Sequence, residues 1–300
     1  MKRILIAGGT GFLGTHLIDY LIHEGYSLSV LSRKSMEPKT NLSYYYWNIN
    51  EGKIDLEAFK NVDTIINLTG ANIGEKRWTA KRKKELFDSR IKSIQLLNQY
   101  VVENNIEIKH FISASATGYY EKKYTDKIFT EDDPSSKDFL GQLCYQWENA
   151  AKAFETMGAR VIILRLGVIM GVDGSFYKKI APFAKLGINP AVGSGKQIIA
   201  WIDIQDVVSL IHFTMVNQFL NGAYNAVASQ QPTMNQLAKI FLKHFGKKKY
   251  LPNVPAFLIR LLYGEMASML LEGNRISNKK IIQAGFQFKA NELELALQNS

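Results

Sequence analysis

Short apolar runs alternate with longer stretches of helical periodicity along the first two-thirds of the chain. Runs of β-branched and other apolar residues predict strands, and apolar residues recurring every three or four positions predict helices. The predicted strands are Arg3–Ala7, Ser27–Leu31, Ser43–Trp47, Thr64–Leu68, His110–Ser113, Val161–Leu166 and Ala223–Asn225. The predicted helices are Phe12–Glu24, Thr79–Glu103 and Gln142–Met157. This alternation predicts an α/β fold, a doubly wound parallel sheet with helices on both faces.

The pattern changes at about Gly171, where glycines and prolines interrupt the alternation as far as Trp201. We therefore expect a sheet domain over 1–170, with a strand at 223–226 that returns to it. Segments on the substrate side follow over 171–250, and a smaller, mostly helical part occupies 251–300. A cleft between these parts is the expected place for a small-molecule substrate.

Composition indicates a globular protein, since 46% of the 300 residues are hydrophobic and 21% are charged. No apolar run approaches the roughly 18 residues of a transmembrane helix, and the run after Arg3 is too short for a signal peptide. The single cysteine, Cys144, excludes an intramolecular disulfide and a cysteine zinc site. We expect a cytoplasmic protein with no bound metal and no membrane contact.

The net charge of +10 raises the question of an acidic partner. Six of the nine residues from Lys76 to Lys84 are basic, but aromatic residues do not alternate with them as in a nucleic-acid groove. A solvated helix face is the simpler interpretation. Nucleic-acid binding is the weaker alternative, and an anionic small molecule is the expected partner.

A glycine-rich turn is the strongest local motif. Gly8, Gly11 and Gly14 follow a buried-strand pattern and precede a helix pattern. Gly8 permits the turn out of the strand, Gly11 leaves room for a pyrophosphate, and Gly14 lets the helix approach the sheet. The N-terminus of the helix then faces the phosphates. The spacing predicts a dinucleotide site, with a structural turn that binds nothing as the alternative.

The end of the second predicted strand bears on which dinucleotide binds. A site for NAD usually has a carboxylate here, but Ser32 is followed by Arg33 and Lys34, and the next carboxylate is Glu37. Two cations can pair with a 2′-phosphate. The sequence therefore favours NADP over NAD, unless Arg33 and Lys34 are only an exposed loop.

Together these features resemble the short-chain dehydrogenase/reductase superfamily in its extended, epimerase-like branch. The whole chain is similar to an atypical subfamily described as NAD(P)-binding sugar-nucleotide epimerases, which has its own C-terminal domain. The matching segments are Gly8-x-x-Gly11-x-x-Gly14, Asn67-Leu68-Thr69-Gly70-Ala71-Asn72-Ile73, Arg77-Trp78-Thr79, Asp88-Ser89-Arg90, Asp138-Phe139-Leu140, Cys144-x-x-Trp147-Glu148, Leu164-Arg165-Leu166-Gly167, Gly193-Ser194-Gly195-Lys196-Gln197, Gly264-Glu265-Met266, Leu271-Glu272-Gly273 and Ala284-Gly285-Phe286-Gln287-Phe288.

The resemblance implies a set of cofactor contacts. Those around the phosphates are Gly8, Thr10, Gly11, Phe12, Leu13 and Gly14. Arg33 and Lys34 would lie at the adenosine end, and Leu68, Thr69 and Gly70 beneath the adenine ribose. Ser113 and Ser115 would lie near the nicotinamide, with Ser115 where the superfamily places its catalytic hydroxyl.

The usual catalytic pair of the superfamily, a Tyr and a Lys four residues apart on one helix, is absent. Alignment through Trp147-Glu148 places Leu140 and Cys144 at the two positions. The chain's Tyr-x-x-x-Lys, at Tyr119 and Lys123, comes too soon after Ser115 to lie on that helix. Tyr119 by itself remains a candidate proton donor. Weaker candidates are Tyr120, Tyr145 and Lys137, and Cys144 is expected to be a buried thiol and no nucleophile.

Substrate recognition also departs from that of nucleotide-sugar epimerases. Ile199 stands at the position of an arginine that clamps the diphosphate, and Asp203 at that of a common histidine. Two functions therefore stay open. The first is an NADP-dependent oxidoreductase or isomerase that acts on a small carbonyl or sugar-like substrate through Ser115 and Tyr119. A homodimer is compatible with this function. The second is a non-catalytic protein that binds the dinucleotide as a sensor or scaffold.

Overall fold

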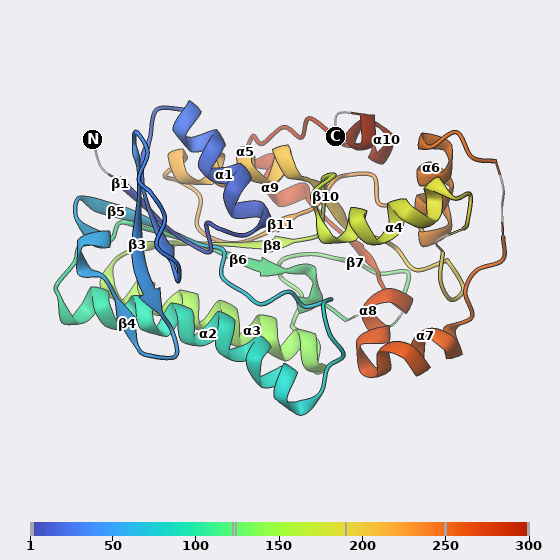
Figure 1. Cartoon of the computed structure of the whole chain (residues 1–300), viewed down its shortest axis with the longest axis horizontal. Coiled ribbons are helices and arrows are strands. Elements are labelled where there is room, and N and C mark those ends of the chain that lie inside the picture. Colours follow the sequence, from blue (N-terminus) through green and yellow to red (C-terminus); the bar gives the residue numbers. More distant parts are fainter. Residues whose placement is uncertain (1–2, 122, 124, 190, 249–250, 299–300) are drawn as a thin grey trace.

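The computed structural model describes residues 3–121, 123, 125–189, 191–248 and 251–298, and one large sheet runs through it (Figure 1). The order of its strands is β11-β8-β6-β5-β1-β2-β3-β4. Their bounds are β1 Arg3–Ala7, β2 Ser27–Ser32, β3 Leu42–Asn48, β4 Lys53–Ile54, β5 Val62–Asn67, β6 His110–Ala116, β8 Arg160–Leu166 and β11 Gly222–Ala226. All neighbours pair parallel except β3 and β4. The predicted parallel α/β sheet is confirmed.

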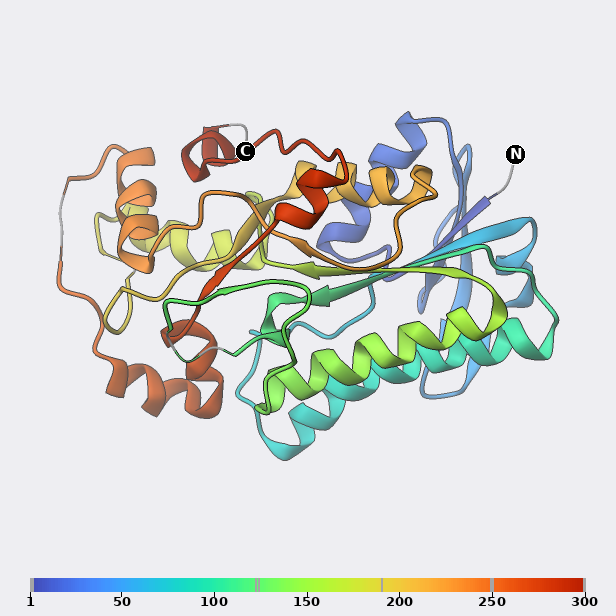
Figure 2. The same ribbon diagram turned by 180° about the vertical axis from the view of Figure 1, so that it is seen from behind.

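Helices cover both faces of the sheet, as Figures 1 and 2 show. On one face lie α1 (Phe12–His23), α5 (Ile204–Val216) and α9 (Lys279–Gln283). On the other lie α2 (Ala80–Glu103) and α3 (Phe139–Lys152), packed against each other. Because both faces are covered, the central strands are buried along almost their whole length and read as continuous apolar runs.

Two predicted helix starts were wrong, and capping explains both. Thr79 was predicted inside a helix, but it precedes α2 and its hydroxyl accepts a hydrogen bond from the Arg82 amide at 3.2 Å. The third predicted helix starts earlier than expected, at Phe139, because the Asp138 carboxylate accepts the Gly141 amide at 2.9 Å. It also ends earlier, and its predicted last turn is the 3₁₀ turn Ala153–Met157.

The chain beyond Gly171 packs against the sheet domain through short elements. These elements and their partners are β7 Ile128–Phe129, β9 Val168–Met170, β10 Trp201–Asp203, β12 Arg275–Ile276, α4 Ser175–Lys185, α6 Met234–His244, α7 Ala256–Tyr263, α8 Ser268–Leu271 and α10 Leu293–Gln298. β9 pairs with β10 and β7 with β12, both parallel. A second apolar core around Trp201 and Phe241 joins α4, α6 and α10. None of the described helices has the length and apolar character needed to cross a bilayer.

Candidate functional site

The sheet changes its winding direction at β1, which has β2 on one side and β5 on the other. In open α/β sheets, ligands bind beyond the carboxyl ends of the strands at such a point. Gly8 follows β1 there and contacts the segment that follows β5. A Cβ atom on Gly8 would lie 2.7 Å from the carbonyl carbon of Leu68, and the φ angle of Gly8 is +85°. Glycine is therefore required at this position both sterically and conformationally.

The other two glycines of the turn, Gly14 and Gly11, differ in whether packing within the chain requires them. A Cβ atom on Gly14 would lie 2.4 Å from the Gly8 carbonyl oxygen, so glycine lets α1 pack closely. A Cβ atom on Gly11 would approach only that same oxygen, at an ordinary 3.4 Å, so packing within the chain does not demand glycine there. Gly11 caps α1 without a side-chain hydrogen bond, which leaves the first amides of the helix available to an anion.

A pocket of about 900 Å³ opens beside this turn, between α1, the end of β2 and the first residues of β3. Thr10 lines it on the turn, and Ser32, Arg33 and Lys34 line it at the end of β2. The Ser32 hydroxyl accepts the Lys34 amide at 3.1 Å, which shapes the chain after the strand. Both cations are exposed, and one carboxylate, Asp19 of α1, also lines the pocket. Its size and charge suit an anionic, nucleotide-sized ligand.

The segment after β5 presents its backbone to the turn. The Thr69 side chain is buried, and its hydroxyl donates to the Asn67 Oδ1 atom at 2.7 Å. Ser113 is buried as well, accepts from the Asn67 Nδ2 atom at 3.3 Å and donates to a backbone carbonyl. Leu68 and Gly70 are more exposed. The hydroxyls of Thr69 and Ser113 therefore stabilise the strand ends, and the backbone is the part that can contact a ligand.

The two candidate catalytic residues, Ser115 and Tyr119, lie on either side of one buried ion pair. Glu148 of α3 and Arg165 of β8 are 3% and 5% exposed in their side chains and make two contacts of 2.9 Å. Ser115, the register partner of Arg165, donates from its hydroxyl to the Glu148 Oε1 atom at 2.7 Å. The Arg165 Cζ atom lies 3.5 Å from the centroid of the Tyr119 ring. The structure thus brings both predicted residues together around Glu148 and Arg165.

Burial and the neighbouring charge have opposite effects on the pKa at both Tyr119 and Arg165. Burial raises the pKa of Tyr119 above its usual value, although the positive charge of Arg165 opposes that shift. The pKa of Arg165 is raised by hydrogen bonding and attraction to Glu148, against the effect of burial. The sequence motifs contained Glu148 and Arg165, but their partnership was not predicted. The available signal was a charged residue inside an otherwise apolar strand, which usually has a buried partner.

Helix α3 places Leu140 and Cys144 beside the strand end that carries Ser115. A Cβ atom on Gly118 would lie 3.3 Å from the Leu140 Cδ1 atom and 3.9 Å from the Cys144 Sγ atom. Both side chains are buried, and burial raises the pKa of the Cys144 thiol to about 12. The thiol is therefore neutral at physiological pH. Tyr119 ends a 3₁₀ turn, and no described helix continues from it to Lys123.

The weaker candidates have other surroundings. Tyr120 is buried, and its hydroxyl donates to Asn225 and accepts from Arg165, both at 2.7 Å. Tyr145 and Lys137 are exposed. Asp203, at the position of the common histidine, caps α5 by accepting the Gln205 amide at 2.8 Å, and burial raises its pKa. Each of these polar groups thus has a structural partner or an exposed position.

Comparisons with known proteins agree with this geometry. Residues 4–226 match the model of the NAD dependent epimerase/dehydratase family, and residues 254–300 match a domain of unknown function, DUF1731. The epimerase family protein YfhF of Bacillus subtilis is 33% identical over 297 residues, which cover 98% of this chain and 96% of that protein. The epimerase family protein SAR0825 of Staphylococcus aureus is also 33% identical, with 100% and 99% covered. A crystal structure of human epimerase family protein SDR39U1 (isoform 2) with NADPH superposes with a TM-score of 0.87 at 28% identity, covering 99% and 98% of the two chains.

Proposed function

The chain belongs to the NAD dependent epimerase/dehydratase family, and on that premise we propose that it binds NADP(H) in the pocket between α1 and β2. The observation that carries the proposal is the glycine turn, where Gly8 and Gly14 are required by packing and Gly11 is open to a ligand. The human relative crystallised with NADPH supports the choice of nicotinamide cofactor. Arg33 and Lys34 support the phosphorylated form, because two cations that line the pocket can pair with a 2′-phosphate.

The cofactor preference is tested by reversing one of these charges. Arg33→Glu is expected to weaken NADPH binding at least tenfold and to change NADH binding less than threefold, because only NADPH has the 2′-phosphate. Isothermal titration calorimetry with both dinucleotides measures this. Lys53→Glu is the control, because it reverses the charge of an exposed side chain outside the pocket. Equal losses for both dinucleotides would contradict the preference, and no binding of either by the wild type would refute the site itself.

We propose further that the protein is an NADP-dependent oxidoreductase or isomerase acting on a small carbonyl or sugar-like substrate. The bound nicotinamide supplies hydride transfer, and Ser115 and Tyr119 are the proposed catalytic residues. Their convergence on Glu148 and Arg165 supports this assignment, since the pair holds both side chains in fixed positions. Tyr119 is the more exposed of the two and is the better placed to exchange a proton with a substrate.

A second function, a dinucleotide-binding protein without turnover, is favoured by one observation. Leu140 has no proton to transfer, and Cys144 is buried and neutral where the pair would need a positive charge. Incubation with stereospecifically deuterated NADPH and a panel of carbonyl metabolites separates the two functions. Label loss that Tyr119→Phe abolishes, while the exposed control Tyr145→Phe retains it, supports the enzyme. Absence of label loss from wild-type protein that binds NADPH supports the second function.

A further inference from the structure

One buried arginine has no counter-charge within the described part of the chain. Arg90 of α2 is 9% exposed, and its guanidinium donates to the carbonyl oxygens of Leu86 and Ala71, both at 3.1 Å. No carboxylate of the described residues forms an ion pair with it. Burial lowers the pKa of Arg90 to about 10, so the group is still charged at neutral pH. Carbonyl oxygens satisfy the N–H groups of a guanidinium but do not neutralise its charge, which is costly to keep buried.

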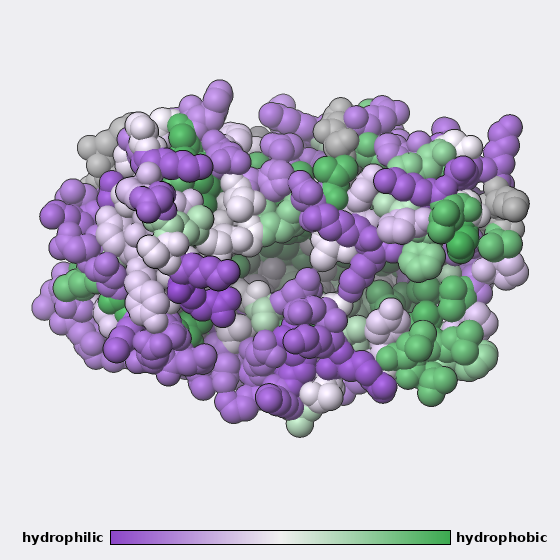
Figure 3. All heavy atoms as spheres, viewed as in Figure 1, coloured by the Kyte–Doolittle hydropathy of each residue, from purple (hydrophilic) through white to green (hydrophobic). Residues whose placement is uncertain are grey.

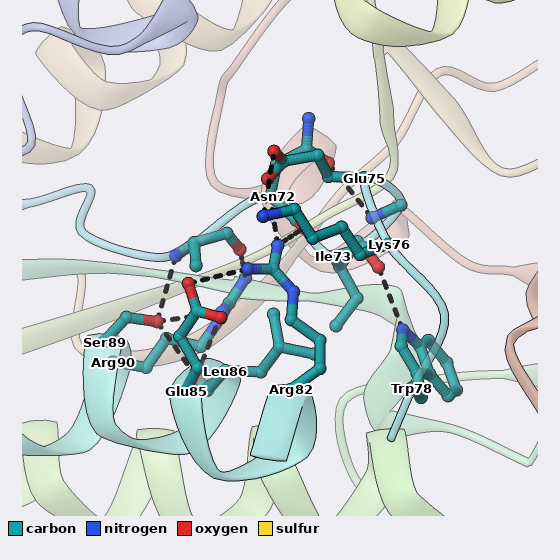
Figure 4. A network of polar contacts seen from close by, with 12 residues as sticks. Asn72, Ile73, Glu75, Lys76, Trp78, Arg82, Glu85, Leu86, Ser89 and Arg90 are labelled. Atoms are coloured by element: carbon teal, nitrogen blue, oxygen red, sulfur yellow. Dashed lines mark hydrogen bonds and ion pairs between the residues drawn. The ribbon is translucent and has the colours of Figure 1, made fainter. Parts of the chain in front are cut away.

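The same helix shows how this chain treats another buried arginine. Arg82 was expected on a solvated helix face, but it is 5% exposed and pairs with Glu75 at 3.1 Å and with Glu85 at 2.7 Å. Figure 4 shows Arg82 and Arg90 rising from α2 toward the segment that carries Asn72 and Glu75. Among the described residues, two carboxylates neutralise Arg82 and none neutralises Arg90. The charge of Arg90 is left to carbonyl oxygens and the Trp147 ring.

Arg90 lies directly behind the segment that contacts the glycine turn. A Cβ atom on Gly70 would lie 2.9 Å from the Arg90 Cζ atom, and the same segment meets Gly8 at Leu68. On its other side Arg90 faces α3, with its Cζ atom 5.0 Å from the centroid of a Trp147 ring. Cys144 lies nearly one helical turn before Trp147 on the same helix. The guanidinium is therefore located between the segment that meets the glycine turn and helix α3, which carries Cys144.

We propose that Arg90 supplies, from α2, the positive charge that Cys144 cannot supply from α3, and that this charge orients the nicotinamide half of the dinucleotide. The inference rests on the proposed binding of NADP(H). Arg90 is a positioning residue in this account, since its guanidinium acts from behind Gly70. Arg33 and Lys34 serve the adenosine end, at the far side of the turn. The phosphate on the nicotinamide ribose, which 2′,5′-ADP lacks, is the group expected to balance Arg90.

The test compares the whole cofactor with its adenosine half. Arg90→Gln is expected to weaken NADPH binding about tenfold, or about 1.4 kcal/mol. Binding of 2′,5′-ADP, which lacks the nicotinamide half, is expected to change less than twofold. Calorimetry with both ligands gives the ratio of affinities. An equal loss for both ligands indicates a purely structural role and overturns the inference, as does an unchanged NADPH affinity.

Two further variants separate charge from folding. Arg90→Lys keeps the charge and loses the paired hydrogen bonds, so NADPH affinity should stay within threefold of wild type even if the melting temperature falls. The double variant Arg90→Gln/Cys144→Lys should recover most of the affinity lost in Arg90→Gln. A loss in Arg90→Lys as large as in Arg90→Gln overturns the role of charge.

Arg82→Gln is the matched control, because it removes a buried arginine of the same helix whose charge is already neutralised. It should leave the ratio of NADPH to 2′,5′-ADP affinity unchanged, and a shift as large as that of Arg90→Gln overturns the inference. Wild-type protein that binds neither ligand refutes the proposed function. Wild-type binding that Arg90→Gln does not alter refutes only the role of Arg90.

Discussion

His212 connects two tyrosine hydroxyls where α5 packs on α1. Tyr20 contacts its Nδ1 atom at 3.4 Å and Tyr26 its Nε2 atom at 3.1 Å. Burial lowers the pKa of His212 below its usual 6.5, so the unfolded chain takes up a proton at a higher pH than the folded one. Stability from this residue is thus present above about pH 6.5 and is lost as the pH falls through the folded pKa. His212→Gln should reduce the loss of unfolding free energy between pH 7.5 and 5, measured by urea denaturation, and an unchanged loss would contradict this role of His212.

Gly8 and Gly25 offer a matched comparison of packing and conformation. Their φ angles are +85° and +84°, but a Cβ atom on Gly25 would meet nothing within 4 Å. Gly25→Ala should therefore cost about 1 kcal/mol, the penalty for a left-handed backbone. Gly8→Ala adds a clash with the Leu68 carbonyl and should cost about 1–3 kcal/mol more. Thermal unfolding of both variants measures the difference. Equal losses of unfolding free energy would show that the segment after β5 can move away from the new Cβ atom without destabilising the fold.

Single residues were predictable from the sequence where local geometry determines them. Gly8 and Gly14 could be predicted because the turn after the first strand and the close approach of the helix to the sheet both follow from the spacing of the glycines along the chain. The surroundings of Ser115 could not be predicted in the same way. Its partners Glu148 and Arg165 lie 33 and 50 positions later along the chain and meet it only through the pairing of β6 with β8 and the packing of α3. Their juxtaposition depends on the folded sheet, and no local pattern encodes it.

Among the elements, α3 places Leu140, Cys144 and Glu148, and its start depends on one cap. The Asp138 carboxylate accepts the Gly141 amide at 2.9 Å. Asp138→Ala should lower the unfolding free energy by about 1 kcal/mol, while Asp138→Asn, which caps equally well, should cost almost nothing. Urea denaturation of the two variants measures this. A similar loss in both would mean that the charge of Asp138 and not its hydrogen bond stabilises the helix.

Elements were predictable in proportion to their length. Strands β1 and β8 carry continuous apolar runs of four residues, 4–7 and 161–164. By contrast, β7 and β12 have two residues each, too few for a period of two to be recognised. These two strands form because segments far apart in the sequence come together in the fold, and the two strands pair with each other. Helix ends were missed for a related reason, since a cap is a contact of one side chain and leaves no periodic signal.

At the scale of the whole molecule, α7 carries the most conspicuous apolar surface, visible at the lower right in Figure 3. Phe257, Leu261 and Leu262 are 67%, 70% and 62% exposed, whereas Ile259 on the same helix is 5% exposed. Exposed side chains remove little apolar area from water on folding, so this face adds little to the stability of a single chain.

A pair of substitutions on α7 distinguishes an uncovered face from a covered one. Leu261→Ser should change the unfolding free energy by less than about 0.5 kcal/mol, because the side chain is mostly solvated before and after folding. Ile259→Ala should cost about 2–4 kcal/mol through the cavity it leaves. Urea denaturation at two protein concentrations measures both. A loss above 1 kcal/mol for Leu261→Ser, together with a midpoint that rises with concentration in the wild type, would mean that a second chain buries α7 in solution and that the exposed fraction describes only the isolated chain.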